Sequence, residues 1–265
     1  REEGFQVAPF KAQNMTSNVY ITKDRGLIGV AQGFQAEAAG LAASVQMNPI
    51  LLQPKSDTGA RVIVLGQDWR EMSGWDYRRE FLPRAKEVVS ECLEKLREEY
   101  DLLVIEGAGS PAEINLREGD IVNMATAEMA ESPVLLVADI DRGGVFASLV
   151  GTLELLTPDE RDRVKGFLIN KFRGDFRLLK PGLDFLEERT GKRVLGVIPY
   201  LEDHGIGEED SLEMPRDGRA CRVAGSSQED LVARDELYHR LATRVRAHLD
   251  LVGIYDCMGL TRSLE

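Results

Sequence analysis

Polar or glycine-rich segments follow four short apolar runs in the chain. They are residues 10–14, 106–110, 139–144 and 170–175. In an open parallel sheet, ligands bind beyond the carboxyl ends of the strands. Each segment alone is compatible with an ordinary polar loop, because glycine is common in turns. Four such segments at one edge of a sheet predict an active site.

The residues in these segments suit the transfer of a phosphoryl group. Glu106 directly follows an apolar run, and a carboxylate in that place can bind Mg²⁺ directly or through water. Gly107 and Gly109 allow backbone amides to approach an anion closely. Cationic side chains for phosphates or carboxylates come from Lys11, Arg142 and Lys171. Phosphoryl transfer depends mainly on positioning and charge neutralisation, and this set offers both.

The elements that must position these residues alternate between short apolar runs and longer amphipathic ones. Strands are predicted over residues 61–66, 102–105, 134–138, 166–169 and 194–198. Helices are predicted over residues 83–99, 120–131, 144–156 and 180–190. Strands that are apolar along their whole length are expected to be buried on both faces. The pattern therefore predicts a three-layer α/β fold with a mostly parallel sheet.

The last part of the chain has a different character. Residues 203–228 are polar, rich in glycine, proline, serine and acids, and have no periodicity, so a linker is predicted there. A single helix is predicted over residues 229–251, with one apolar stripe made by Leu237, Leu241, Val245 and Leu249. We expect a main domain at 1–202, the linker, and a C-terminal helical segment at 229–265.

Composition excludes several classes of protein. Hydrophobic residues make up 43% of the chain, which is too many for a disordered protein. A formal charge of −12 argues against binding nucleic acid by bulk electrostatics, although a cationic pocket for an anionic small molecule stays possible. No apolar run is long enough to span a bilayer. The three cysteines have no metal-site spacing, and we expect a cytoplasmic protein without nucleic-acid or membrane partners.

Two features of the sequence concern the phosphate site itself. No loop of the GxxxxGK(S/T) type is present, and Gly191–Lys192 is interpreted as a plain turn before a strand. Residues 4–11 read as a helix end followed by the second strand of a nucleotide-binding domain. We therefore expect the first strand and the phosphate loop upstream, and an open sheet edge where that strand would lie.

Six motifs, in this order along the chain, closely resemble cobyric acid synthases. They are VAPFKAQNM (7–15), MNPILLQPKSD (47–57), IEGAGSPAEINL (105–116), DIVNM (120–124), VADIDRGGVFAS (137–148) and INKFRGD (169–175). The resemblance extends over residues 5–212, and residues 238–251 also resemble the C-terminal helix of that family.

The resemblance implies a fold and a reaction. The family has a synthase domain similar to dethiobiotin synthetase, of the P-loop NTPase type. It amidates the b, d, e and g carboxylates of adenosylcobyrinic acid a,c-diamide in cobalamin biosynthesis. It uses ATP, Mg²⁺ and ammonia from glutamine, and it forms an acyl phosphate that ammonia then attacks. A corrinoid and glutamine or ammonia are the implied partners.

The resemblance also implies roles for individual residues. Lys11, Glu106 and Asp141 are implied to be catalytic, with Glu106 the metal ligand. The implied nucleotide-binding residues are Lys11, Gln13, Asn14, Gly107, Gly109, Asn170, Lys171, Arg173 and Pro199. The implied substrate-binding residues are Asn48, Asp57, Ser110, Asp139, Arg142 and Gly143.

The sequence departs from the family pattern in three ways. The phosphate loop is missing, and Leu27 and Val30 stand where an acid and an arginine are usual. Only residues 203–230 stand where the family carries a glutamine amidotransferase domain, and the nucleophilic cysteine with a His-x-Glu partner is not found. We expect weak or absent ATP turnover, and ammonia production on a separate domain or subunit.

Two alternatives follow from these departures. One is a non-catalytic remnant that still binds a corrinoid or a nucleotide. The other is a ParA/MinD-like ATPase, which would need a phosphate loop with a second lysine. Among the remaining residues, Glu37 is expected to be a charge on a helix surface, and Trp69 and Trp75 to pack their segment onto the sheet rather than to form a wall for a macrocycle.

Overall fold

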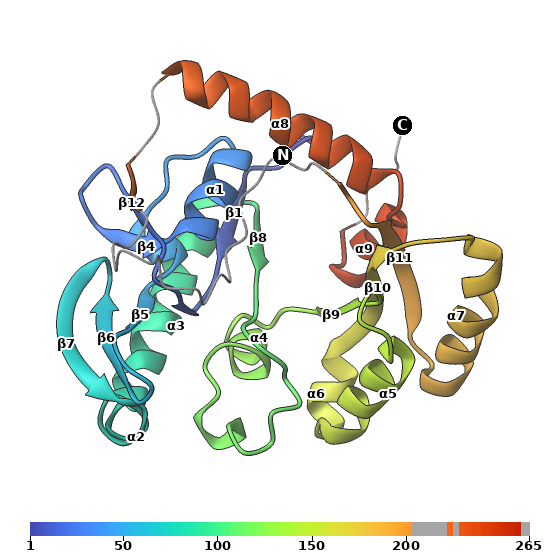
Figure 1. The fold of residues 1–265 in the computed structure, drawn as a ribbon, viewed down its shortest axis with the longest axis horizontal. Coiled ribbons are helices and arrows are strands. Elements are labelled where there is room, and N and C mark those ends of the chain that lie inside the picture. The colour runs from blue at the N-terminus through green and yellow to red at the C-terminus, as the bar shows by residue number, and fades with distance from the viewer. Residues whose placement is uncertain (203–221, 225–227, 261–265) are drawn as a thin grey trace. The chain divides into compact units, whose positions relative to one another are not determined.

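The computed structural model describes residues 1–202, 222–224 and 228–260 (Figure 1). The chain divides into two compact units. The first comprises Arg1–Ser110, Leu116–Ala130 and Gly205–His239, and the second comprises Pro111–Asn115, Glu131–His204 and Arg240–Glu265. Most of the predicted linker lies outside the described residues. The predicted domain boundaries stay a prediction.

The first unit contains a parallel strand pair with helices packed against it. Strand β1 (Val7–Phe10) pairs with β8 (Leu102–Ile105), and each residue of one strand has its partner in the other. Helix α1 (Val30–Ala38) packs against β1, and α3 (Leu82–Glu99) packs against β8. Helix α3 follows the predicted helix closely because its apolar residues recur at helical spacing. The fully buried side chains of this core include Phe10, Phe81 and Leu96.

Two further sheets of the first unit contain antiparallel pairs that the strand pattern did not predict. One has the order β2 (Gln13–Met15), β5 (Ile50–Pro54), β6 (Gly59–Val64) and β7 (Gln67–Ser73). The other has the order β12 (Arg222–Ala224), β3 (Val19–Ile21) and β4 (Leu27–Gly29). Leu65 and Gly66, both at positive φ, connect β6 to β7 in a two-residue hairpin turn.

The two tryptophans near this hairpin behave differently. The Trp69 ring packs on Phe81 with its centroid 4.6 Å away, so its predicted packing role is confirmed. Trp75 is 75% exposed, so the same prediction is wrong for Trp75. The reason is local: Trp75 lies in the short helix α2 (Gly74–Asp76), beyond the end of β7.

The second unit holds a parallel three-stranded sheet, ordered β11 (Arg193–Pro199), β10 (Val164–Phe172) and β9 (Val134–Asp139). Helix α5 (Val145–Leu155) packs against β9, α6 (Pro158–Arg163) against β10 and α7 (Phe176–Thr190) against β11. Five of the eight strand pairs among the described residues are parallel, so the predicted α/β fold with a mostly parallel sheet is confirmed.

Strands β8 and β9 each lie at the edge of a sheet. In the part of the chain that the structure describes, β8 pairs only with β1, and β9 only with β10. Val104 in the middle of β8 is 64% exposed, and Val137 in β9 is 61% exposed. The expectation that these apolar strands are buried on both faces is therefore wrong for both. An edge strand lacks the neighbour that would help to cover its side chains.

The predicted single C-terminal helix is two helices. Helix α8 (Gln228–Arg246) ends before a short connection, and α9 (Leu251–Cys257) follows. The Asp250 side chain accepts a hydrogen bond from the Gly253 amide and thereby caps α9. Leu249 forms a bridge with Gly196 of β11, so the break is made by contacts that helical periodicity does not reveal. None of the described helices combines the length and the apolar character needed to cross a bilayer.

The remaining short elements connect these larger ones. They are η1 (Val45–Met47), η2 (Tyr77–Phe81), η3 (Arg117–Gly119) and α4 (Met124–Met129). The predicted helix over residues 120–131 is thus shorter than expected, because residues 121–123 form a bend and the helix begins only at Met124. The Asp120 carboxylate holds this bend by accepting from the amides of Val122, Asn123 and Ala125.

Candidate functional site

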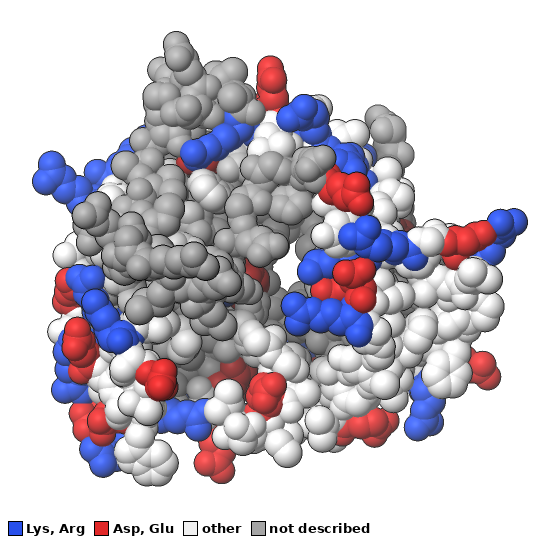
Figure 2. Space-filling view, in the orientation of Figure 1, with Lys and Arg blue, Asp and Glu red and all other residues white. Residues whose placement is uncertain are grey.

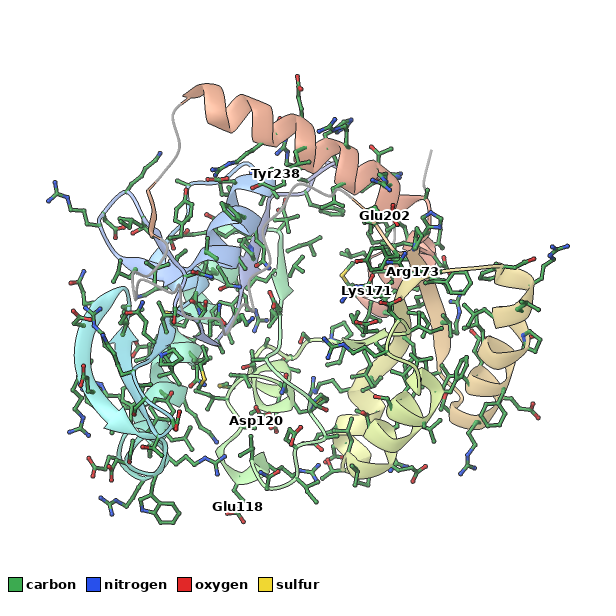
Figure 3. All side chains as sticks on the ribbon, in the orientation of Figure 1. Glu118, Asp120, Lys171, Arg173, Glu202 and Tyr238 are labelled. Carbon is green, nitrogen blue, oxygen red and sulfur yellow. The ribbon has the colours of Figure 1, made fainter. Side chains whose placement is uncertain are left out.

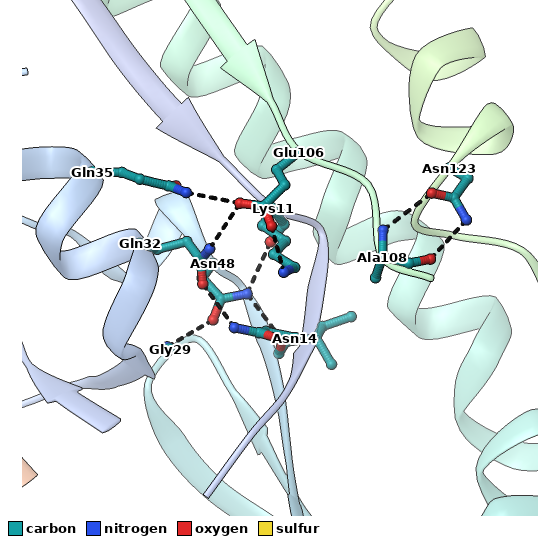
Figure 4. Close-up of polar contacts among 10 residues, drawn as sticks. Lys11, Asn14, Gly29, Gln32, Gln35, Asn48, Glu106, Ala108 and Asn123 are labelled. Atoms are coloured by element: carbon teal, nitrogen blue, oxygen red, sulfur yellow. Dashed lines mark hydrogen bonds and ion pairs between the residues drawn. The ribbon is translucent and has the colours of Figure 1, made fainter. Parts of the chain in front are cut away.

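Lys11 and Glu106 form an ion pair in the first unit, with 2.8 Å between Nζ and Oε1 (Figure 4). Phe10 of β1 is the register partner of Ile105 of β8, so the next residue of each parallel strand lies at the same edge. The Lys11 side chain is only 7% exposed, whereas the Glu106 side chain is 39% exposed. A buried ammonium and a partly solvated carboxylate therefore meet where the sequence predicts ligand binding.

Two glutamines of α1 hold the second oxygen of Glu106. Gln35 Nε2 donates to Glu106 Oε2 at 2.8 Å, and Gln32 Nε2 lies 3.5 Å from the same oxygen. Figure 4 shows both side chains reaching from the helix toward the carboxylate. The sequence analysis did not name these glutamines. Their i, i+3 spacing, which puts them on one face of a helix, is the signal that could have indicated them.

Asn14 and Asn48 complete this buried polar network. Asn14 Nδ2 donates to Gln32 Oε1 at 3.0 Å. Asn48 is 1% exposed; its amide donates to the carbonyls of Lys11 and Ile50 and accepts from the Gly29 amide. These backbone contacts give Asn48 a structural role, and its contact with a substrate stays a prediction. A Cβ on Gly29 would lie 2.4 Å from Asn14 Nδ2, so the network requires glycine there.

Asn123 fixes the glycine-containing loop that follows β8. Its side chain accepts from the Ala108 amide at 3.1 Å and donates to the Ala108 carbonyl at 2.8 Å (Figure 4). A Cβ on Gly107 would lie 2.2 Å from Asn123 Oδ1, so this approach also requires glycine. Gly109 has a φ of +64°, in the left-handed region. The loop after β8 is therefore held in one conformation by a residue that sequence reasoning did not select.

Replacing Asn123 with alanine is expected to lower the free energy of unfolding by about 1 to 2 kcal/mol. Both hydrogen bonds to Ala108 would be lost, and two partly buried backbone groups would lose their partner. Urea denaturation of the wild type and the variant measures this difference. The control is Asn115→Ala at an exposed position, which should change stability by less than about 0.5 kcal/mol. Equal losses of unfolding free energy for the two variants would contradict the role given to the Asn123 side chain in holding the loop after β8 (the Asn123 clamp).

A second group of charged residues lies in the second unit, at the carboxyl ends of β9 and β10 and directly after them. Lys171 Nζ is 2.9 Å from Asp139 Oδ2, and Arg173 Nε is 3.2 Å from Asp141 Oδ1. The hydrogen bond from Lys171 holds the pKa of Asp139 below its ordinary value, and the same contact raises the pKa of Lys171. Lys171 also adopts a left-handed φ of +61° at the end of the paired region.

Arg173 is the centre of this second group. Its guanidinium lies 3.4 Å from the centroid of the Tyr200 ring, and Glu202 Oε1 is 3.4 Å from its Nη1. Figure 3 labels Lys171, Arg173 and Glu202 close together beside the sheet of the second unit. Figure 2 shows basic and acidic side chains intermixed in this part of the surface. Lys171 and Arg173 are therefore each matched by a nearby anion, and Arg173 also by an aromatic ring.

The other predicted site residues take varied positions. Gln13 accepts a hydrogen bond from the Tyr77 hydroxyl, and Asn170 accepts one from the Lys171 amide. Asp57 is exposed in the turn between β5 and β6, and Pro199 ends β11. Exposed or half-exposed loop positions are taken by Ser110, Arg142 and Gly143. Each unit thus holds one cluster of predicted site residues, while others such as Asp57 lie apart, and the convergence of all of them on one ligand stays a prediction.

The CobQ/CobB/MinD/ParA nucleotide-binding domain family matches residues 1–211. The chain belongs to this family. Curated relatives of this nucleotide-binding domain include the cobyric acid synthase of Desulforamulus reducens, 66% identical over 81% of this chain and 42% of the relative. The cobyric acid synthase of Geobacillus kaustophilus is 55% identical over 87% of this chain and 45% of its own length. The cobyric acid synthase of Carboxydothermus hydrogenoformans is 58% identical over 80% of this chain and 43% of its own length.

This member of the CobQ/CobB/MinD/ParA family spans less than half the length of the curated relatives that it matches. The predicted resemblance to cobyric acid synthases is confirmed, as is an α/β fold of the nucleotide-binding type. The family places the chain among nucleotide-binding proteins, which agrees with the phosphate chemistry predicted from its loops.

The described residues of this nucleotide-binding domain do not form a magnesium site made of protein side chains alone, but they fit a site that is completed by nucleotide phosphates. They contain no group of three or more histidine, cysteine or acidic side chains that could hold a metal ion. Leu27 and Val30 are apolar and supply no ligand. Mg²⁺ is commonly held by one or two carboxylates together with substrate phosphates. Glu106, partly exposed, therefore fits a magnesium ion that arrives with a nucleotide.

Proposed function

We propose that this chain is the ATP-dependent, amide-forming part of a cobyric acid synthase. The reaction would amidate the b, d, e and g carboxylates of adenosylcobyrinic acid a,c-diamide in cobalamin biosynthesis. The ion pair between Lys11 and Glu106, at the adjoining ends of β1 and β8, is the observation that carries the proposal. The names of the relatives support the substrate and the type of reaction.

The proposed chemistry has two steps. A substrate carboxylate oxygen attacks the γ-phosphorus of ATP, which forms an acyl phosphate and releases ADP. Ammonia then attacks the acyl carbon, phosphate leaves with the C–O bond electrons, and the ammonium proton is lost to give the amide. Both steps move charge on phosphate oxygens, so they need cations and backbone amides rather than a nucleophile from the protein.

The residues of the first cluster would serve the phosphates. The ammonium of Lys11 would neutralise charge on the transferred phosphoryl group, and Glu106 would hold Mg²⁺, which stabilises the phosphate charges when it is bound. Amides of the loop that contains Gly107 and Gly109 would bind phosphate oxygens. Gln13 and Asn14 are also proposed to contact the nucleotide.

The residues of the second unit are proposed for the adenine and the corrinoid. Asn170, Lys171, Arg173 and Pro199 would contact the nucleotide base and its surroundings. The guanidinium of Arg142 would recognise carboxylates of the corrinoid. Asp139, Asp141 and Gly143 are in the same segment and are proposed to face the corrinoid as well. Further contacts to the corrinoid are proposed for Asn48, Asp57 and Ser110.

Ammonia is proposed to come from glutamine hydrolysed on a separate domain or subunit. Cys92 is buried in α3, and burial raises the pKa of its thiol to about 11, which is unsuitable for a nucleophile at neutral pH. Cys257 is half-buried near the end of α9. Cys221 lies outside the described residues.

The test is a reaction of the chain with ATP·Mg²⁺, an ammonium salt and the a,c-diamide, followed by mass spectrometry of the corrinoid and by phosphate release. Amide formation that requires all three components and is lost in Lys11→Met supports the proposal. Phosphate release that is independent of both corrinoid and ammonia contradicts it. Leu27 and Val30 favour the alternative of a non-catalytic binding protein, for which calorimetry should show binding of corrinoid or nucleotide without turnover.

A further inference from the structure

We propose that Gln35, supported by Gln32, is a positioning residue that orients the Glu106 carboxylate toward a divalent cation carried by a bound nucleotide. This inference rests on the proposed function, because it assigns a task to residues around the same carboxylate. It concerns two side chains of α1, Gln32 and Gln35, that contact the same carboxylate.

The geometry gives each oxygen of Glu106 a separate donor. Lys11 Nζ contacts Oε1 at 2.8 Å, whereas Gln35 Nε2 contacts Oε2 at 2.8 Å. One donor follows β1 and the other lies on α1, so the carboxylate is fixed from two elements and cannot rotate freely. An ionised carboxylate offers about four lone-pair positions. The side chain is 39% exposed, so lone pairs on its solvent side stay accessible to a cation.

The second glutamine at this carboxylate oxygen, Gln32, is itself held in place. Gln32 is completely buried, and its Oε1 accepts from Asn14 at 3.0 Å while its Nε2 faces Glu106. Because the ionised Glu106 carboxylate can only accept, the Gln32 nitrogen must face it, which leaves the Gln32 oxygen to accept from Asn14. Gly29, which lacks a Cβ, allows Asn14 and Gln32 to approach each other. The donors are thus fixed before any ligand binds.

A neutral donor at position 35 suits this task better than a cation would. Lys11 already supplies one positive charge next to Glu106. A second cation at 2.8 Å would leave the group with a net positive charge and would repel Mg²⁺. A glutamine amide holds the oxygen by a hydrogen bond without cancelling its charge. The choice of glutamine therefore fits a carboxylate that must stay available to a metal ion.

The experiment measures nucleotide binding to the full 265-residue chain with and without a divalent cation. Mn²⁺ is the probe, because it takes the same oxygen ligands as Mg²⁺ and its binding is followed by electron paramagnetic resonance. In Gln35→Leu, binding of Mn²⁺·ATP should weaken about tenfold, whereas binding of metal-free ATP should stay unchanged. Gln67→Leu, at an exposed position on β7, is the matched control and should alter neither.

Equal weakening of metal-loaded and metal-free ATP in Gln35→Leu would overturn the positioning role, since it would indicate a general effect on the fold. An unchanged affinity for Mn²⁺·ATP would overturn it as well. A second readout needs no nucleotide: the side-chain amide resonances of Gln35 should shift in Glu106→Ala. If the wild type binds no nucleotide, the proposed function fails. If the Gln35 resonances do not shift in Glu106→Ala, the contact between Gln35 and Glu106 is absent and this inference fails, whatever the result for nucleotide binding.

Discussion

Replacing Glu37 with glutamine is expected to lower the free energy of unfolding by about 3 kcal/mol, although the two side chains have nearly the same shape. Glu37 lies on α1, and its side chain is 5% exposed. Its carboxylate accepts hydrogen bonds from the hydroxyls of Tyr20 and Tyr238, at 3.0 and 3.1 Å. Arg234 Nη1 lies 3.0 Å from one oxygen and 3.2 Å from the other.

The expected loss follows from the number of donors around this carboxylate. A glutamine amide keeps one acceptor oxygen and replaces the other with an NH₂ group, which cannot accept from a hydroxyl or a guanidinium. The positive charge of Arg234, which also lies over the Phe34 ring, would remain without its buried anion. Breaking a buried ion pair by removing one partner costs about 3 to 5 kcal/mol.

Denaturant unfolding of wild type and Glu37→Gln measures the loss. Glu94→Gln, at an exposed position of α3, is the matched control and should stay within about 0.5 kcal/mol of the wild type. The double variant Glu37→Gln/Arg234→Met should recover part of the stability, because it removes the stranded charge. Additive losses in the double variant would show that the two side chains are not coupled.

The same group of residues makes stability depend on alkaline pH. Burial, and secondarily the charge of Glu37, raises the pKa of Tyr20 to about 12, and the pKa of Tyr238 is also raised. Unfolded tyrosine titrates near pH 10. Below pH 10 the tyrosine hydroxyls keep their protons in both the folded and the unfolded state, so the buried tyrosines make their full contribution to the free energy of unfolding. From pH 10 to about 12 the unfolded state loses protons first, so the free energy of unfolding should fall.

Glu37 also illustrates what the sequence could and could not reveal. It was expected to be a charge on a helix surface, and that expectation is wrong. Its partners Arg234 and Tyr238 are 197 and 201 residues away in sequence, on α8. No local pattern in residues 36–40 marks a carboxylate that a distant helix will cover. Periodicity reports which face of a helix is apolar, but it does not report which polar residue receives a partner.

Local patterns were sufficient for several elements and for the Lys11–Glu106 pair. Apolar runs and helical spacing predicted α3, β8 and β11 closely, because the residue types that favour these elements stand together in local sequence. The ends of parallel strands meet at one edge, so Lys11 and Glu106 could be expected together. Tertiary contacts that the patterns do not encode include the Asn123 clamp and the break before α9.

Removing Glu106 is expected to destabilise the protein more than removing Lys11, although both changes break the same ion pair. Glu106→Gln should lower the free energy of unfolding by about 2 kcal/mol, because the buried ammonium of Lys11 loses its carboxylate. This expected loss is smaller than the loss for a fully buried ion pair, because the Glu106 side chain is 39% exposed. Lys11→Met should cost less than about 1 kcal/mol, because methionine fills the buried space of the lysine stem and Glu106 is partly solvated.

The asymmetry is measured by urea denaturation of the two single variants and of Lys11→Met/Glu106→Gln. The double variant should be more stable than Glu106→Gln alone, since it contains no buried cation to be compensated. A larger loss for Lys11→Met than for Glu106→Gln would contradict the burial difference on which the expectation rests. The unequal exposure also agrees with the proposed function: the partly exposed carboxylate is placed to meet an incoming cation, and the buried ammonium would neutralise the phosphate.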